Sequence, residues 1–176
     1  MMTDDELIVK LAELRAARTG DDYPVPATEQ AVRQTELGLG FQLPPILRRC
    51  YLEIANGGFG PVVFSLNGLT DHYRQSLAER PEAGCIPWPE GLLEICDRGC
   101  AIKSAVYCLV DGCPVYRVDP SYEYDEIRDA IPEDRRDERL ARVGGSTWIE
   151  ATSMVEWLTR FAEGQDSFGP GYGGPR

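Results

Sequence analysis

Two β-prone runs that flank one turn signal constrain the fold of this chain more than any other feature. The runs are residues 101–110 and 114–118, and the dipeptide Asp111-Gly112 lies between them. Asp-Gly in such a position is a strong signal for a type I′ turn, which joins two antiparallel strands in a hairpin. A short run at residues 147–150 is expected to add an edge strand. Because these strands follow helices instead of alternating with them, the pattern favours an α+β fold over a parallel α/β sheet.

Helix signals occupy much of the chain before the hairpin and one segment after it. Thr3 and Glu6 are spaced as a capping box, in which each side chain bonds the backbone N–H of the other residue. Ser153 and Glu156 repeat that spacing near the C-terminus. Pro45 can occupy the first turn of a helix, where its missing N–H costs nothing. The expected helices cover residues 4–18, 29–37, 45–55, 71–80 and 154–163.

The length of 176 residues predicts one domain, with an appendage at each end. Residues 1–22 are expected to form an amphipathic helix and a linker that packs on the body of the protein. The main domain is assigned to residues 23–164. Residues 165–176 are rich in Gly and Pro, so this tail is expected to be disordered.

The net charge of −11, from 18 basic and 29 acidic residues, limits the possible partners. Phosphate backbones and anionic lipids need Lys and Arg to neutralise them, so we expect no binding to nucleic acid or to a membrane surface. A basic protein would instead be attracted. The alternative is that the charge only keeps the protein soluble. The acidic N-terminal segment 3–6 does not resemble a secretory signal, which predicts a cytoplasmic protein.

Six cysteines need an explanation other than disulfides, because the cytoplasm is reducing. The pairs Cys96/Cys100 and Cys108/Cys113 could be zinc ligands, but their spacing is wider than the usual two-residue knuckle. Their neighbours are apolar, so a thiol here would behave as a small hydrophobic side chain. We therefore expect buried, reduced thiols and no metal at the six positions, which are Cys50, Cys85, Cys96, Cys100, Cys108 and Cys113.

No set of residues with a catalytic pattern emerges. His72 is the only histidine, and Ser76 lies one helical turn away, but the Gly-x-Ser-x-Gly elbow of a serine hydrolase is missing. The glycine clusters at 57–60 and 144–145 lack the lysine and the spacing of a phosphate loop. We expect no enzyme activity, no cofactor and a surface position for His72. An enzyme that uses His72 and nearby acids is the alternative.

The order of four motifs resembles the SUKH superfamily, which is named for a fungal cell-wall synthesis regulator and its bacterial relatives. The motifs are a glutamate before an LG…LP break, a helix that ends in Asn-Gly-Gly, an LLEICDRGC segment, and a hairpin followed by a C-terminal helix. The resemblance implies an antiparallel sheet of about five or six strands flanked by helices, without catalytic activity. Eight residues match the pattern and are assigned to caps and turns: Glu36, Pro44, Asn56, Gly57, Gly58, Asp97, Gly99 and Cys100.

The resemblance also implies a function, since bacterial members resemble immunity proteins that neutralise a cognate toxin, often a nuclease. The alternative is a regulatory or scaffolding module like the fungal relatives. A carboxylate-rich surface could imitate the phosphates that a nuclease attracts. Such a surface is predicted in the segment 119–138, with the alternative that the segment is only a solvated loop. Its candidates are Asp119, Glu123, Asp125, Glu126, Asp129, Glu133 and Asp134, with Tyr122 and Tyr124 as aromatic anchors.

Overall fold

The computed structural model describes residues 2–17, 24–61, 63–82 and 84–165. Within these residues four strands form one antiparallel sheet, in which each strand pairs with the next strand along the chain. The prediction of an α+β fold is confirmed, but the sheet has four strands in the described residues and not five or six. Among the described residues of the β-prone run at 61–64, Val63 forms an isolated bridge with Cys96, and no named strand is present. The strands are β1 (Leu92–Asp97), β2 (Lys103–Tyr107), β3 (Val115–Asp119) and β4 (Ser146–Ala151).

The hairpin between β2 and β3 is confirmed, but its turn differs from the expected one. β2 ends at Tyr107, and residues 108–114 form the connection, so the loop is longer than a two-residue turn. The positive φ angles fall at Gly112 and Cys113, one position later than a type I′ turn at Asp111-Gly112 requires. The expected edge strand after residue 146 is present as β4, at one end of the strand order.

The helices begin where the sequence supplies capping side chains. The Thr3–Glu6 capping box is complete, and the Ser153 hydroxyl accepts a hydrogen bond from the backbone N–H of Glu156. The helix expected at 71–80 starts earlier, because the Ser65 hydroxyl caps it by accepting from Gly68. The helices are α1 (Asp4–Ala16), α2 (Glu29–Leu39), α3 (Pro45–Glu53), α4 (Leu66–Ala78), α5 (Tyr124–Ile127) and α6 (Met154–Ala162), with 3-10 turns η1 (Arg128–Ala130) and η2 (Glu133–Arg135).

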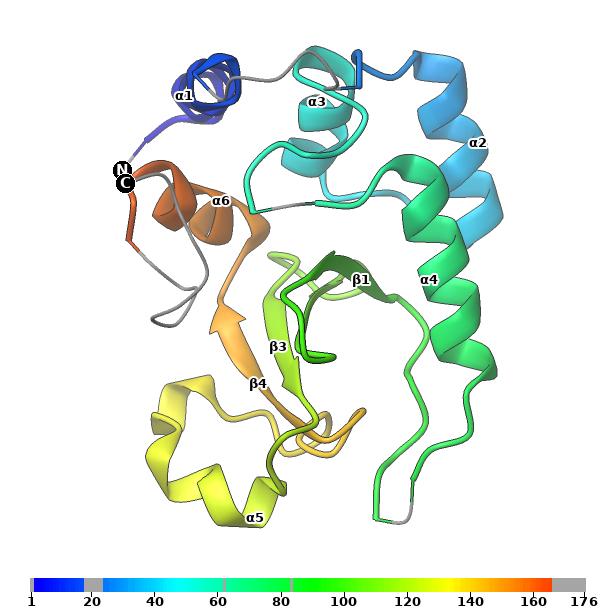
Figure 1. Ribbon diagram of the computed structural model, residues 1–176, viewed down its shortest axis with the longest axis vertical. Helices are drawn as coiled ribbons and strands as arrows, with labels where there is room; N and C mark the ends of the chain where they lie inside the picture. Colours follow the sequence, from blue (N-terminus) through cyan, green and yellow to red (C-terminus); the bar gives the residue numbers. More distant parts are fainter. Residues whose placement is uncertain (1, 18–23, 62, 83, 166–176) are drawn as a thin grey trace.

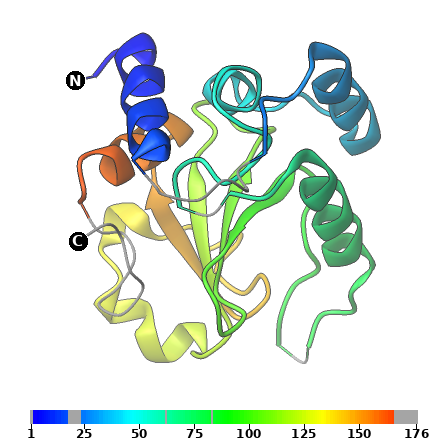
Figure 2. The same ribbon diagram turned by 45° about the horizontal axis from the view of Figure 1, so that its top comes forward.

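The two faces of the sheet are covered by different parts of the chain. Side chains on one face, such as Ile95 and Val106, share the main core with residues from α1, α2, α3, α4 and α6. On the other face Tyr116 packs against Leu140 and Val143, from the connection between β3 and β4. Figures 1 and 2 show α1, α2 and α3 at one end of the molecule and α5 at the opposite end. The predicted interface segment is thus remote from α2 and α3.

The terminal segments were predicted as appendages, and the described part of the first one joins the core. Leu7, Ile8 and Leu11 of α1 are buried, and α1 contacts α3 and α6. The linker residues 18–23 and the tail 166–176 lie outside the described residues. No helix in the described ranges is both long and apolar enough to cross a membrane.

Candidate functional site

The connection between β3 and β4, residues 120–145, carries most of the predicted interface residues. It contains α5, η1 and η2 and is the yellow-green to yellow segment of Figure 1. Tyr122 is 50% exposed, and Glu123, Asp125, Glu126 and Asp129 are exposed. Glu133 and Asp134 are exposed as well, so the connection brings seven of the nine proposed interface residues to the surface.

Two of the proposed interface residues, Asp119 and Tyr124, are buried, so the structure does not place their side chains at the surface where docking was predicted. Asp119 is 3% exposed, at the end of β3, and its carboxylate accepts a hydrogen bond from the backbone N–H of Ser121. Tyr124 is 2% exposed and packs against Ile131 and Ala141. The acidic segment thus has a small core of its own, for which Tyr124 supplies the largest side chain.

Four exposed carboxylates of the connection form no ion pair with any other described residue, and we call them the acidic face. They differ from Asp125, whose two oxygens lie 2.8 and 2.9 Å from Nη2 of Arg142. A paired carboxylate is partly neutralised by its arginine, whereas an unpaired one keeps its full attraction for a distant positive charge. The members of the acidic face are Glu123, Glu126, Asp129 and Glu133.

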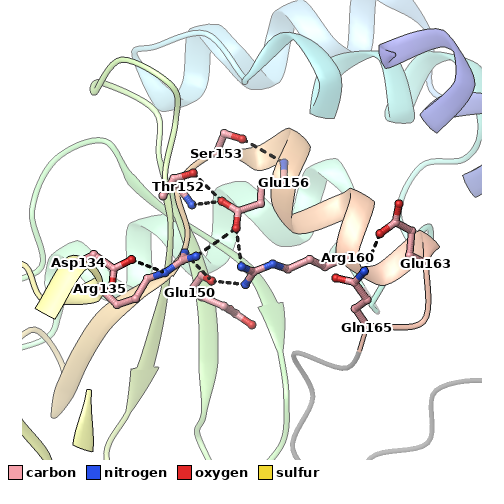
Figure 3. Close-up of polar contacts among 9 residues, drawn as sticks. All are labelled: Asp134, Arg135, Glu150, Thr152, Ser153, Glu156, Arg160, Glu163 and Gln165. Carbon is pink, nitrogen blue, oxygen red and sulfur yellow. Dashed lines mark hydrogen bonds and ion pairs between the residues drawn. The ribbon is translucent and has the colours of Figure 1, made fainter. Parts of the chain in front are cut away.

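An arginine clamp fixes the connection to the body of the protein (Figure 3). Arg135 of η2 and Arg160 of α6 both donate to the backbone oxygen of Glu150, over 3.3 and 2.9 Å. Both guanidinium groups also pair with the carboxylate of Glu156. Burial opposes the charged form of Glu156, but hydrogen bonds from Thr152 and Arg135 lower its pKa overall. We call Arg135, Glu150, Glu156 and Arg160 the arginine clamp.

A second contact, just after η2, holds the connection against β3. The Tyr116 hydroxyl donates to Asp137 over 2.9 Å, and Arg139 donates to the same carboxylate over 3.0 and 2.9 Å. The hydrogen bonds from Arg139 lower the pKa of Asp137 despite its burial. The connection is therefore anchored to both β3 and α6.

A cluster of buried charged side chains joins the turn after β1 to β4. Arg98 forms an ion pair with Glu150, and the exposed fractions of the two side chains are 3% and 6%. Ser104 links them, because its hydroxyl accepts from Nε of Arg98 over 2.7 Å and donates to Glu150 over 2.9 Å. Glu150 therefore joins the cluster through its carboxylate and the arginine clamp through its backbone.

The residues that match the family pattern lie in caps and turns. The Glu36 carboxylate accepts from the N–H of Leu43 over 3.1 Å, at the break before α3. The Asn56 side chain accepts from the N–H of Leu66, at the start of α4. Asp97 accepts from the N–H of Gly99, where the chain turns after β1. The remaining members have related positions: Pro44 precedes α3, and Gly57, Gly58, Gly99 and Cys100 have positive φ.

The surroundings of His72 include an acid that the sequence did not indicate. Its ring stacks on Phe64, and Nδ1 lies 3.7 Å from the carboxylate of Glu94 on β1. Glu94 is 2% exposed and also pairs with Lys103 over 2.9 Å. No hydrogen bond joins His72 to Ser76 within the described contacts. Local spacing could not reveal Glu94, because α4 and β1 become neighbours only in the folded chain.

The cysteines differ in exposure more than the sequence predicted. Cys50 and Cys96 are buried, and burial raises the pKa of each thiol to about 12. Cys100 is exposed, which corrects the expectation that all six are buried, because it lies in the turn between β1 and β2. In the described ranges, which contain all six, no disulfide forms and no three His, Cys, Asp or Glu side chains gather as metal ligands.

No protein-family model matches the chain, and no curated protein matches it. The function is therefore inferred from the residues and contacts of this chain.

Proposed function

We propose that this protein is a non-catalytic immunity protein that neutralises a cognate bacterial toxin, in the cytoplasm, by stoichiometric binding through the acidic face. The observation that carries the proposal is the set of four exposed carboxylates that form no ion pair with other described residues, in the same connection as the half-exposed side chain of Tyr122. The motif order described above, which resembles the SUKH superfamily, supports the choice of a toxin as the partner.

The chemistry of a nuclease toxin fits such a surface. A nuclease cleft is positively charged because it must attract phosphate, so a group of carboxylates can occupy it in place of the substrate. Attraction between opposite charges raises the association rate, and salt screens that attraction. The arginine clamp adds order to the acidic face before a partner arrives, which reduces the entropy lost on binding.

The test is to purify the chain with the proteins encoded by its neighbouring genes and to measure binding at two salt concentrations. We expect a toxin among them, and an association rate that falls at least about tenfold between 50 and 500 mM salt. Co-expression of the chain should also restore growth to cells that produce the toxin. A stable complex with a housekeeping protein, or no complex with any neighbouring gene product, would contradict the proposal.

Charge-neutralising variants then locate the surface. The triple variant Glu126→Gln/Asp129→Asn/Glu133→Gln removes three charges from the acidic face. We expect it to lower the association rate about tenfold at low salt, because the attraction scales with the charge presented to the partner.

The matched control removes the same number of charges elsewhere. Asp71, Glu90 and Asp111 are exposed and form no ion pair with other described residues, and none of them belongs to the acidic face. The triple variant Asp71→Asn/Glu90→Gln/Asp111→Asn should leave the association rate within about twofold of the unmodified chain. Equal losses in the two triple variants would mean that net charge, and not the acidic face, attracts the partner.

A further inference from the structure

A cavity of about 420 Å³ adjoins the acidic face and has no role in the contacts described so far. Its walls come from the end of α4, the described residues between 79 and 88, the start of β2, the end of β3, and Gly144-Gly145 before β4. Tyr122 and Glu123 also line it, so the cavity and the acidic face share residues. The volume lies within the range of about 300–1,000 Å³ that is typical of ligand sites.

Backbone contacts hold the walls of this cavity in place. The N–H of Ile86 donates to the backbone oxygen of Arg142 over 3.0 Å, and Ile86 forms a parallel bridge with Val143. At Gly145 the chain approaches itself so closely that an added Cβ would lie 2.6 Å from Cα of Pro120. A residue with a side chain is excluded there, because the φ of +119° at Gly145 also requires glycine.

Aromatic and apolar side chains form much of the lining. Trp88 is fixed, because its indole N–H donates to the backbone oxygen of Leu92 over 2.6 Å. Tyr122 is 50% exposed and Ile86 is 38% exposed, and both line the cavity. Such a lining offers flat apolar surface to a long side chain. The ring of Trp88 already has the ammonium group of Lys103 over it, 5.6 Å from its centroid, so the ring that remains to attract a further cation is that of Tyr122.

The charges around the cavity favour a positive occupant. Glu79, Glu82 and Glu123 line it, are exposed, and form no ion pair with other described residues. Lys103 also lines it, but the buried carboxylate of Glu94 neutralises this ammonium group at 2.9 Å. Three carboxylates therefore face the single remaining positive charge, that of Arg80.

We propose that this pocket receives an arginine side chain of the protein partner. This inference rests on the proposed function and adds to it the chemical group that the partner inserts. A guanidinium group can stack on an aromatic ring while its N–H donors pair with carboxylates, and its aliphatic stem suits apolar walls. Aromatic pockets next to complementary charge commonly contribute most of the affinity of an interface.

The first experiment tests the pocket without a partner, using N-acetyl-arginine amide as the probe in NMR titrations. We expect shifts of the Trp88 indole N–H and of the Gly144 and Gly145 amides, with saturation in the millimolar range. The Trp88→Phe variant assigns the indole signal, because the chain has only three tryptophans. N-acetyl-norvaline amide, which lacks the guanidinium group, and N-acetyl-glutamate amide should cause at most a tenth of these shifts. Equal shifts with the norvaline compound, or no shifts at these residues, would overturn the inference.

The second experiment uses the complex with the toxin. We expect Tyr122→Ala to weaken binding at least tenfold and Glu123→Gln to weaken it about fivefold, while Tyr122→Phe keeps most of the affinity. The control is Leu109→Ala, which truncates a side chain that is 59% exposed and does not line the cavity. It should change the affinity less than twofold.

The two proposals can fail separately. If the toxin binds in a salt-dependent manner and Tyr122→Ala does not weaken it, the pocket inference falls and the proposed function stands. If the arginine probe shifts the pocket signals but no neighbouring gene product binds, the toxin assignment falls while the selectivity of the pocket for arginine is supported.

Discussion

Two nearby tyrosines should respond in opposite ways to the same truncation, although both were candidates for the interface. Tyr124 is 2% exposed and packs with Ile131 and Ala141, whereas Tyr122 is 50% exposed. Replacing a buried aromatic residue by alanine costs about 3–5 kcal/mol. The cluster around Tyr124 is small, so we expect Tyr124→Ala to lower the free energy of unfolding by about 3 kcal/mol. Tyr122→Ala should change it by less than about 0.5 kcal/mol.

A third variant separates the ring of Tyr124 from its hydroxyl. The hydroxyl donates over 3.2 Å to Glu138, whose side chain is 59% exposed and can bond water instead. Tyr124→Phe should therefore cost less than about 1 kcal/mol. Urea unfolding measures all three variants from the transition midpoint and the m-value. Equal midpoints for Tyr122→Ala and Tyr124→Ala would refute the reasoning, and a lower m-value for Tyr124→Ala would mean that the connection unfolds separately from the sheet.

Three further predictions concern the contacts that hold the connection and the sheet together. Arg98→Ala should lower the free energy of unfolding by about 3–5 kcal/mol in urea, because it leaves the buried carboxylate of Glu150 without its cation. Gly145→Ala should lower the thermal midpoint far more than Gly164→Ala, since both have positive φ but only Gly145 has backbone atoms within 3 Å of an added Cβ. The pKa of Asp137 is lowered in the folded protein, so its contribution is present above about pH 4 and is lost as the pH falls through the lower folded value. Urea midpoints measured from pH 5 to pH 2 should therefore fall less steeply in Asp137→Asn than in the unmodified chain.

Features that depend on neighbours along the chain were predictable from the sequence. The capping box at Thr3 and the cap at Ser153 give the observed helix starts, because each bond joins residues three positions apart. The hairpin and the edge strand after residue 146 were also predictable. The strand count was not, because it was taken from the family resemblance, and the described residues of the run at 61–64 form an isolated bridge at Val63 instead of a strand.

Features that depend on residues far apart in the chain could not be predicted in the same way. The segment 119–138 contains few large aliphatic side chains, and Tyr124 was predicted to be an aromatic anchor at its surface. The structure buries Tyr124 there, because Ala141 and the partly buried ring of Trp148 pack against it from outside that segment. The acid beside His72 comes from β1, and the cavity is lined by four separate stretches of the chain. A pattern of neighbouring residues along the chain does not predict such long-range contacts.

Because the basic residues pair with some carboxylates and not with others, the net negative charge is concentrated on one part of the surface. Sixteen of the 18 basic residues are arginines, and several of them lie within the protein's own contacts: Arg98 in the buried cluster, Arg135 and Arg160 in the clamp, Arg142 on Asp125. Each such pair cancels one carboxylate and orders part of the backbone. The exposed acids of the connection that remain unpaired are those of the acidic face. The arginine–carboxylate pairs order the backbone that carries them. An arginine of the partner would therefore form the same kind of arginine–carboxylate pair that the chain forms internally. Because the surface is already ordered, little entropy would be lost on binding.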